Sequence, residues 1–124
     1  MPGWVVARQP SAAVTCAGEP IPNYLDPVFR EEYARFIAAF AAAFDGDERL
    51  AFIEIGVGLF GETQPAEEVH DPCLLAAGLT SQAWVAYGQW VIDQYVAAFS
   101  RTPLLLEFAP RYLSPCERRT LTDY

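Results

Sequence analysis

The sequence predicts an α/β fold with parallel strands, and three observations carry this prediction. Strand-like and helix-like segments alternate along the 124 residues, an order that is typical of parallel βαβ units. Segment 50–56 is apolar almost throughout, as parallel strands covered on both faces usually are. Segment 28–44 repeats apolar side chains at helical spacing, and a helix with so apolar a stripe is expected to need a large sheet to cover it.

Residues 1–26 are expected to form a long irregular loop. Proline and glycine recur there too often for a helix, and proline lacks the N–H that a sheet needs. They stand at Pro2, Gly3, Pro10, Gly18, Pro20 and Pro22. Asp26-Pro27 then begins the first helix, with Asp at the N-cap and Pro at the first helical position, and segment 45–47 ends it.

The second half of the chain repeats helix and strand. Thr80 or Ser81 is expected to cap a second helix, a short strand follows at 104–108, and the capping box 114–117 begins a third helix. Two strands cannot protect both faces and both edges of a sheet. We therefore expect residues 1–124 to be an incomplete domain, truncated at both ends.

Charge and hydropathy exclude several classes of partner. The formal net charge is −8, so the positive surface that nucleic acids or anionic lipids require is missing. No stretch reaches the roughly 20 apolar residues of a membrane span, and no signal peptide is visible. We expect neither nucleic acid nor membrane as a partner, whereas neutral or cationic small molecules fit. Compartment and oligomeric state stay open.

The cysteines and the single histidine, His70, give no metal-ligand spacing. We interpret the cysteines as small buried hydrophobic residues; they are Cys16, Cys73 and Cys116. The acidic run 67–71 around His70 is expected to be a solvated loop. The glycines of 56–61 lack the context of a phosphate-binding loop, so we expect no metal and no cofactor.

Three motifs follow one another along the chain: Met1-Pro2-Gly3-Trp4, Asn23-Tyr24-Leu25-Asp26-Pro27 with its helix, and Phe52-Ile53-Glu54-Ile55-Gly56 followed by Gly61-Glu62. With segments 90–95 and 102–104, they resemble glycoside-hydrolase barrels related to family 42 β-galactosidases and their bacterial relatives. The resemblance implies a fragment, roughly half, of a (β/α)8 TIM barrel, with its active site at the C-terminal ends of the parallel strands.

The resemblance also implies that Glu62 is the general acid/base, although the family usually has Asn where Gly61 stands. Glycosidases use two carboxyl groups, one protonated and one ionised, and the nucleophile would come from a strand outside this sequence. The alternative for Glu62 is a loop carboxylate without a catalytic role. Glu107 ends the second strand on the same side and is a candidate substrate ligand. For Glu54, inside the first strand, pairing with an arginine is favoured over substrate contact.

Trp4, Asn23 and Tyr24 are candidate substrate-binding residues, because aromatic faces stack on sugars. Trp4 and Tyr24 would equally serve to anchor the N-terminal segment, and Asn23 would equally cap the turn that follows it. The sequence thus predicts part of a glycoside hydrolase acting on O-glycosidic bonds, with a carbohydrate substrate and with activity in the complete enzyme. The alternatives are a non-catalytic carbohydrate-binding barrel and a small α/β interaction domain that pairs through its sheet edge.

Overall fold

The computed structural model describes residues 3–107 and 112–124, and for Phe60 the backbone alone. Met1, Pro2 and Phe108 of the predicted segments lie outside the described residues. The helices are α1 (Gly3–Arg8), α2 (Pro27–Phe44), α3 (Asp71–Ala76), α4 (Ser81–Ala98) and α5 (Pro115–Thr122). The strands are β1 (Ala13–Cys16), β2 (Glu19–Pro22), β3 (Ile53–Glu54) and β4 (Leu104–Leu105), and three short 3₁₀ turns are η1 (Pro10–Ala12), η2 (Leu59–Gly61) and η3 (Glu68–His70).

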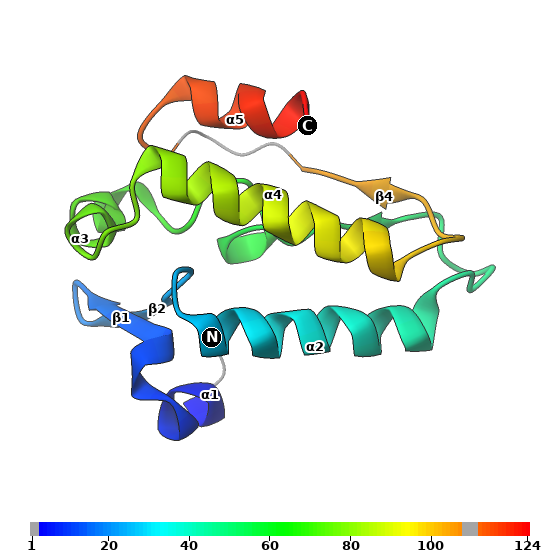
Figure 1. The fold of residues 1–124 in the computed structure, drawn as a ribbon, viewed down its shortest axis with the longest axis horizontal. Helices are drawn as coiled ribbons and strands as arrows, with labels where there is room; N and C mark the ends of the chain where they lie inside the picture. The colour runs from blue at the N-terminus through cyan, green and yellow to red at the C-terminus, as the bar shows by residue number, and fades with distance from the viewer. Residues whose placement is uncertain (1–2, 108–111) are drawn as a thin grey trace.

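The prediction of half a (β/α)8 barrel is wrong. Within the described residues the strands form two separate two-stranded sheets, one antiparallel (β1–β2) and one parallel (β3–β4). The parallel pair is two residues long on each strand. The two long helices α2 and α4 run side by side (Figure 1) and contribute most of the secondary structure. Packing of α2 on α4 covers part of the apolar stripe that predicts a large sheet, whereas Phe36 and Phe44 of α2 stay exposed.

The prediction that residues 1–26 are an irregular loop is also wrong, because they contain α1 and the β1–β2 hairpin. Pro20 and Pro22 lie opposite Thr15 and Ala13. These two prolines are two residues apart, so both nitrogens point away from the partner strand and no ladder hydrogen bond is lost. The turn has positive φ at both central residues, Ala17 and Gly18, as a tight type I′ hairpin requires.

The predicted ends of the long helices are confirmed. The Asp26 carboxylate accepts hydrogen bonds from the N–H groups of Val28 and Phe29, and the Thr80 hydroxyl accepts one from Ala83 N–H. At the other end of α2, the Asp45 carboxylate accepts bonds from the backbone of residues 100–102. Asp45 therefore fastens the end of α2 to the turn that leads from α4 into β4.

The β3–β4 sheet has one face packed and the other face open. Ile53, Ile55 and Val57 are buried, whereas Phe52 is 52% exposed and Leu105 is 46% exposed. This alternation is typical of a strand with one face on the core. The expectation that both faces of segment 50–56 are covered is therefore wrong for the described residues, and the open face is the side on which Glu54 lies.

A disulfide joins the hairpin to α3. Cys16 and Cys73 form this bond across 57 residues of sequence, and Cys116 is a free, exposed thiol. The interpretation of the three cysteines as buried hydrophobic residues is thus wrong for Cys73 and Cys116, and incomplete for the fully buried Cys16. The pairing escapes sequence inspection because it depends on the hairpin, which brings residues that are distant in sequence together.

Candidate functional site

Three of the glutamates that the sequence singled out come together at the open face of the β3–β4 sheet. Pairing of Ile53 with Leu104 places Glu54 in β3 level with Leu105, and Glu107 follows two residues later. The carboxyl groups of Glu54 and Glu107 hydrogen-bond to each other, and the charge of Glu62 acts on Glu54 as well. We call Glu54, Glu62 and Glu107 the carboxyl trio.

Within the trio, Glu54 holds its proton more tightly than an isolated glutamate would. The hydrogen bond with Glu107 raises the pKa of Glu54, and burial and the negative charges of Glu107 and Glu62 raise it further. Two carboxyl groups can hydrogen-bond to each other only when one carries the proton. Glu54 therefore keeps its proton to a higher pH than an ordinary glutamate, a property that acid–base chemistry on a substrate can use.

Among residues 3–107 and 112–124 the expected arginine partner of Glu54 is not found, and the charged groups that shift its pKa are acidic. Glu107 and Glu54 are both exposed, and Glu62 is partly exposed. A ligand in solvent can therefore reach the carboxyl groups directly.

A tight glycine turn sets Glu62 beside Glu54. Gly58 N–H donates to the carbonyl oxygen of Glu62 across 2.8 Å, and Gln64 Nε2 donates to Glu62 Oε2 across 2.7 Å. Gly61 has a φ of +85°, and a Cβ there would lie 2.9 Å from Glu54 Oε1. Glycine at position 61 thus lets the Glu54 carboxyl lie directly against the turn, which gives a physical reason for glycine before Glu62.

The other predicted substrate-binding residues do not join the trio. Trp4 lies in α1 and is 60% exposed. Asn23 caps a turn, since its Oδ1 accepts from Leu25 N–H and its Nδ2 donates to the Ser11 carbonyl. Tyr24 is buried, and its hydroxyl donates to the Pro65 carbonyl. Of the two roles weighed for Asn23 and Tyr24, the structure shows anchoring.

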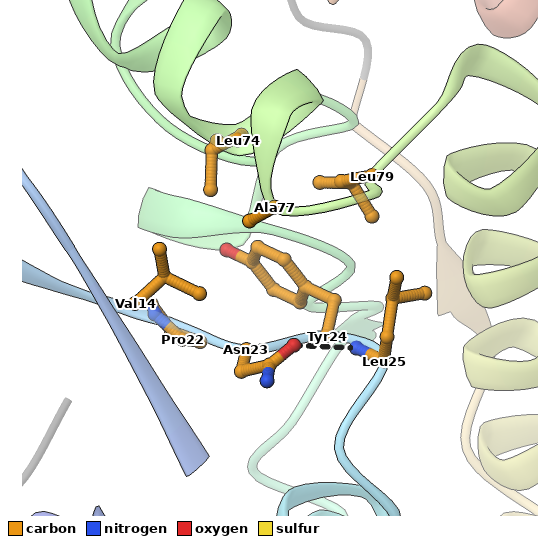
Figure 2. A pocket seen from close by; sticks show the side chains of 8 residues that line it. All are labelled: Val14, Pro22, Asn23, Tyr24, Leu25, Leu74, Ala77 and Leu79. Carbon is orange, nitrogen blue, oxygen red and sulfur yellow. Dashed lines mark hydrogen bonds between the residues drawn. The ribbon is translucent and has the colours of Figure 1, made fainter. Parts of the chain in front are cut away.

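Figure 2 shows the small cavity beside Tyr24, between the hairpin and α3. Its volume is about 10 Å³, room for roughly one water molecule. The wall is mostly aliphatic: Val14, Pro22, Asn23, Tyr24, Leu25, Leu74, Ala77 and Leu79. The cavity is far too small for a sugar, so it is a packing defect of the core.

The acidic run around His70 differs from the solvated loop that its sequence suggests. His70 is 3% exposed, its Nε2 lies 3.6 Å from Glu19 Oε2, and its Nδ1 has no partner in the described part of the chain. Burial raises the pKa of Asp71 to about 6, with help from the charges of Glu68 and Glu117. In the described residues no three His, Cys, Asp or Glu side chains, the carboxyl trio included, are arranged so that they could hold a metal ion.

Packing accounts for the aromatic side chains of α4. Trp84, Tyr87 and Tyr95 are buried, and Trp84 Nε1 donates to the Thr63 carbonyl. Arg30 of α2 lies over the rings of Tyr87 and Trp90. These residues form the core behind the sheet, as the helical spacing predicts.

No family model, curated protein or solved structure matches this chain. Among the helices that the structure describes, none combines the length and hydropathy needed to cross a membrane. The carboxyl trio and the sheet face around it are therefore the features from which a function is proposed.

Proposed function

We propose that the carboxyl trio is an acid–base site that hydrolyses O-glycosidic bonds of a carbohydrate. The observation that carries this proposal is the meeting of three glutamates at one sheet face, where the β3–β4 register sets Glu54 level with Leu105 and the turn at Gly61 lies against the Glu54 carboxyl. Glycoside hydrolysis needs one carboxylic acid to protonate the leaving oxygen and one carboxylate to act at the anomeric carbon. The trio offers three carboxyl groups for these two roles, and the pKa of one of them, Glu54, is raised.

In this proposal the Glu54–Glu107 pair supplies the proton, and Glu62 supplies the second carboxylate. The proton passes to the glycosidic oxygen as its bond to the anomeric carbon breaks. A water molecule then bonds to that carbon through its oxygen and gives one proton to a carboxylate of the trio, which restores the starting protonation. Glu62 as the acid/base itself stays a prediction. The raised pKa of Glu54 favours Glu54 as the donor, because a raised pKa lets a carboxylic acid keep its proton at a pH closer to that at which the enzyme works.

A second candidate function is carbohydrate binding without catalysis. The observation in its favour is that Glu54 and Glu107 are exposed, whereas catalytic carboxyl groups usually work in sites that exclude water. Phe52, which is exposed two residues before Glu54, offers an aromatic face for a sugar ring.

The test is turnover of a panel of aryl glycosides by the purified protein and by its Glu54→Gln, Glu62→Gln and Glu107→Gln variants. Loss of a catalytic acid or base is expected to lower kcat by about 10²–10⁴-fold. Glu48→Gln is the matched control, since Glu48 is an exposed glutamate in the loop before β3, and it should leave turnover unchanged. Sugar binding that survives in all variants, without turnover in any protein, would favour the second candidate.

A further inference from the structure

The base of the β1–β2 hairpin is anchored to the start of α2. Asn23 N–H donates to the Ala12 carbonyl across 2.8 Å, which closes the hairpin just outside its two strands. Ser11 Oγ donates to Asp26 Oδ2 across 2.7 Å, and Asp26 is the residue that caps α2. None of these bonds involves a cysteine, so the base is held in place whatever the state of the disulfide.

The tip of the hairpin lies beside α3 (Figure 1), and its non-covalent attachment there is slight. Among the described residues no backbone hydrogen bond joins the hairpin to α3. His70 Nε2 lies 3.6 Å from Glu19 Oε2, and the Glu19 side chain is 70% exposed, so solvent screens this pair. Ile21 is buried, but the same contact contains the cavity of Figure 2, so its packing is incomplete. The Cys16–Cys73 disulfide is therefore the main attachment of the tip.

The two sulfur atoms of this disulfide differ in access. Cys16 is completely buried, whereas Cys73 is partly exposed. A thiolate attacks a disulfide at a sulfur that it can reach, so attack by a dithiol reductant falls on Cys73 Sγ. The S–S bond breaks, Cys16 Sγ leaves with the electron pair and takes up a proton, and a mixed disulfide forms at Cys73. The second thiol of the reductant then displaces Cys73 Sγ. In total, two electrons and two protons pass to the protein, and the reductant becomes a disulfide.

We propose that the Cys16–Cys73 disulfide is a redox switch, which a dithiol reductant opens so that the hairpin tip leaves α3. The movement exposes apolar side chains that are buried in the oxidised protein, Ile21 on the hairpin and Leu74 on α3. The helices α2 and α4 stay packed, because they contact each other directly and Asp45 joins the end of α2 to residues 100–102. The switch does not depend on the proposed hydrolysis.

The experiment is hydrogen exchange of the full protein, followed by mass spectrometry, with and without the small dithiol dithiothreitol. Reduction without denaturant should add the thiols of Cys16 and Cys73 to that of Cys116, which is already free. The backbone amides of residues 13–22 should then exchange at least about 100-fold faster, whereas those of α2 and α4 should keep their protection. Reoxidation should restore slow exchange in the hairpin.

Two variants and a monothiol sharpen the test. Cys116→Ser removes the exposed free thiol and should respond to dithiothreitol as the wild type does. Cys16→Ser/Cys73→Ser should show fast exchange in the hairpin with or without the reductant, and protection of its α2 and α4 amides checks that it is folded. Glutathione has one thiol and stops at the mixed disulfide. In Cys116→Ser, alkylation after glutathione treatment should leave glutathione on Cys73 and the alkyl group on Cys16.

Each of four results would overturn the inference. New thiols that appear only in denaturant would show that reductants do not reach the disulfide in the folded protein. Slow hairpin exchange after complete reduction would show that non-covalent packing alone holds the tip. Exchange that rises in α2 and α4 as much as in the hairpin would make the bond a support of the whole fold and not a local switch. Glutathione found on Cys16 would contradict the attack at Cys73.

Discussion

Glu117 and Glu54 are both glutamates in short elements that pack near α4, yet their surroundings are opposite. Glu117, in α5, is 3% exposed and accepts hydrogen bonds from Tyr112 N–H, Leu113 N–H and the Ser81 hydroxyl. Glu54, in β3, is exposed and meets two other carboxyl groups. A carboxyl group that accepts hydrogen bonds from the backbone holds parts of the fold together, whereas acidic neighbours raise the pKa of a carboxyl group.

The same contrast separates two regions of the molecule. We call the β1–β2 hairpin, α3 and α5 the closed end; there the disulfide and Glu117 join elements that are distant in sequence. The open face of the β3–β4 sheet lacks such links among the described residues. We therefore expect substitutions at the closed end to change stability and substitutions at the open face to change binding and proton affinity.

The largest effect on stability is expected from loss of the Cys16–Cys73 disulfide. The Cys16→Ser/Cys73→Ser double variant frees a loop of 57 residues, which should lower the free energy of unfolding by about 4 kcal/mol. Urea denaturation of the wild type with and without a reductant, and of the double variant, measures the change. A loss well below 1 kcal/mol would contradict the view that this bond stabilises the closed end.

Glu117→Ala should lower the free energy of unfolding by about 3 kcal/mol, because it leaves the N–H groups of Tyr112 and Leu113 without their acceptor. Glu54→Ala is the comparison at the open face and should change stability by less than about 0.5 kcal/mol. Chemical denaturation of both variants measures the two losses of unfolding free energy. Similar losses in Glu117→Ala and Glu54→Ala would contradict the distinction between the closed end and the open face.

Asp71 should make the closed end less stable as the pH rises. Its pKa is raised from 3.8 to about 6 in the folded protein, so the folded state loses stability as the pH rises from about 4 to about 6. Asp71→Asn should therefore be more stable than the wild type above pH 6, by about 1 kcal/mol after solvent screening, and equal to it below about pH 3. Thermal melts across this pH range measure the difference in stability between the two proteins. A difference that does not vary with pH would show that ionisation of Asp71 is not its cause.

The smallest effect is expected for Glu54→Gln. Because the pKa of Glu54 is raised in the folded state, its ionised form costs the folded protein a little stability, and glutamine removes that cost. The variant should be more stable than the wild type by a few tenths of a kcal/mol at pH 8, and by nothing near pH 3. Differential scanning calorimetry at the two pH values checks it, with Glu48→Gln expected to show no change at either.

The sequence predicts those parts of the fold that depend on local chemistry. The caps at Asp26, Thr80 and Ser114 depend on a side chain within three residues of the groups it binds, and the structure has all three. The hairpin does not follow from the sequence of residues 1–26, because their many prolines argue against a strand. Its turn also requires a positive φ at Ala17, which alanine rarely adopts. The Cys16–Cys73 pairing depends on that hairpin and was missed with it.

At the site, sequence reasoning selects the three glutamates but not their relation. Glu54 and Glu107 meet only because β3 and β4 pair in the register that sets Glu54 level with Leu105, and neither residue's own neighbours in sequence reveal that register. The open side of the sheet was also unpredictable, because a continuous apolar run does not show which alternate residues face the core. The sequence shows Gly61 only as a departure from the family motif. The structure adds that glycine at this position lets the Glu54 carboxyl approach the turn closely.

The most direct test of the carboxyl trio is a carbon-13 NMR titration of the glutamate side chains, in the wild type and in Glu107→Gln and Glu62→Gln. Here the Glu54 carboxyl is predicted to titrate above the ordinary glutamate value of about 4.3, and the midpoint should fall in both variants, further in Glu107→Gln, because Glu107 contributes both a hydrogen bond and a charge. A Glu54 carboxyl that titrates at the ordinary value in all three proteins would contradict the shared proton and the site built on it.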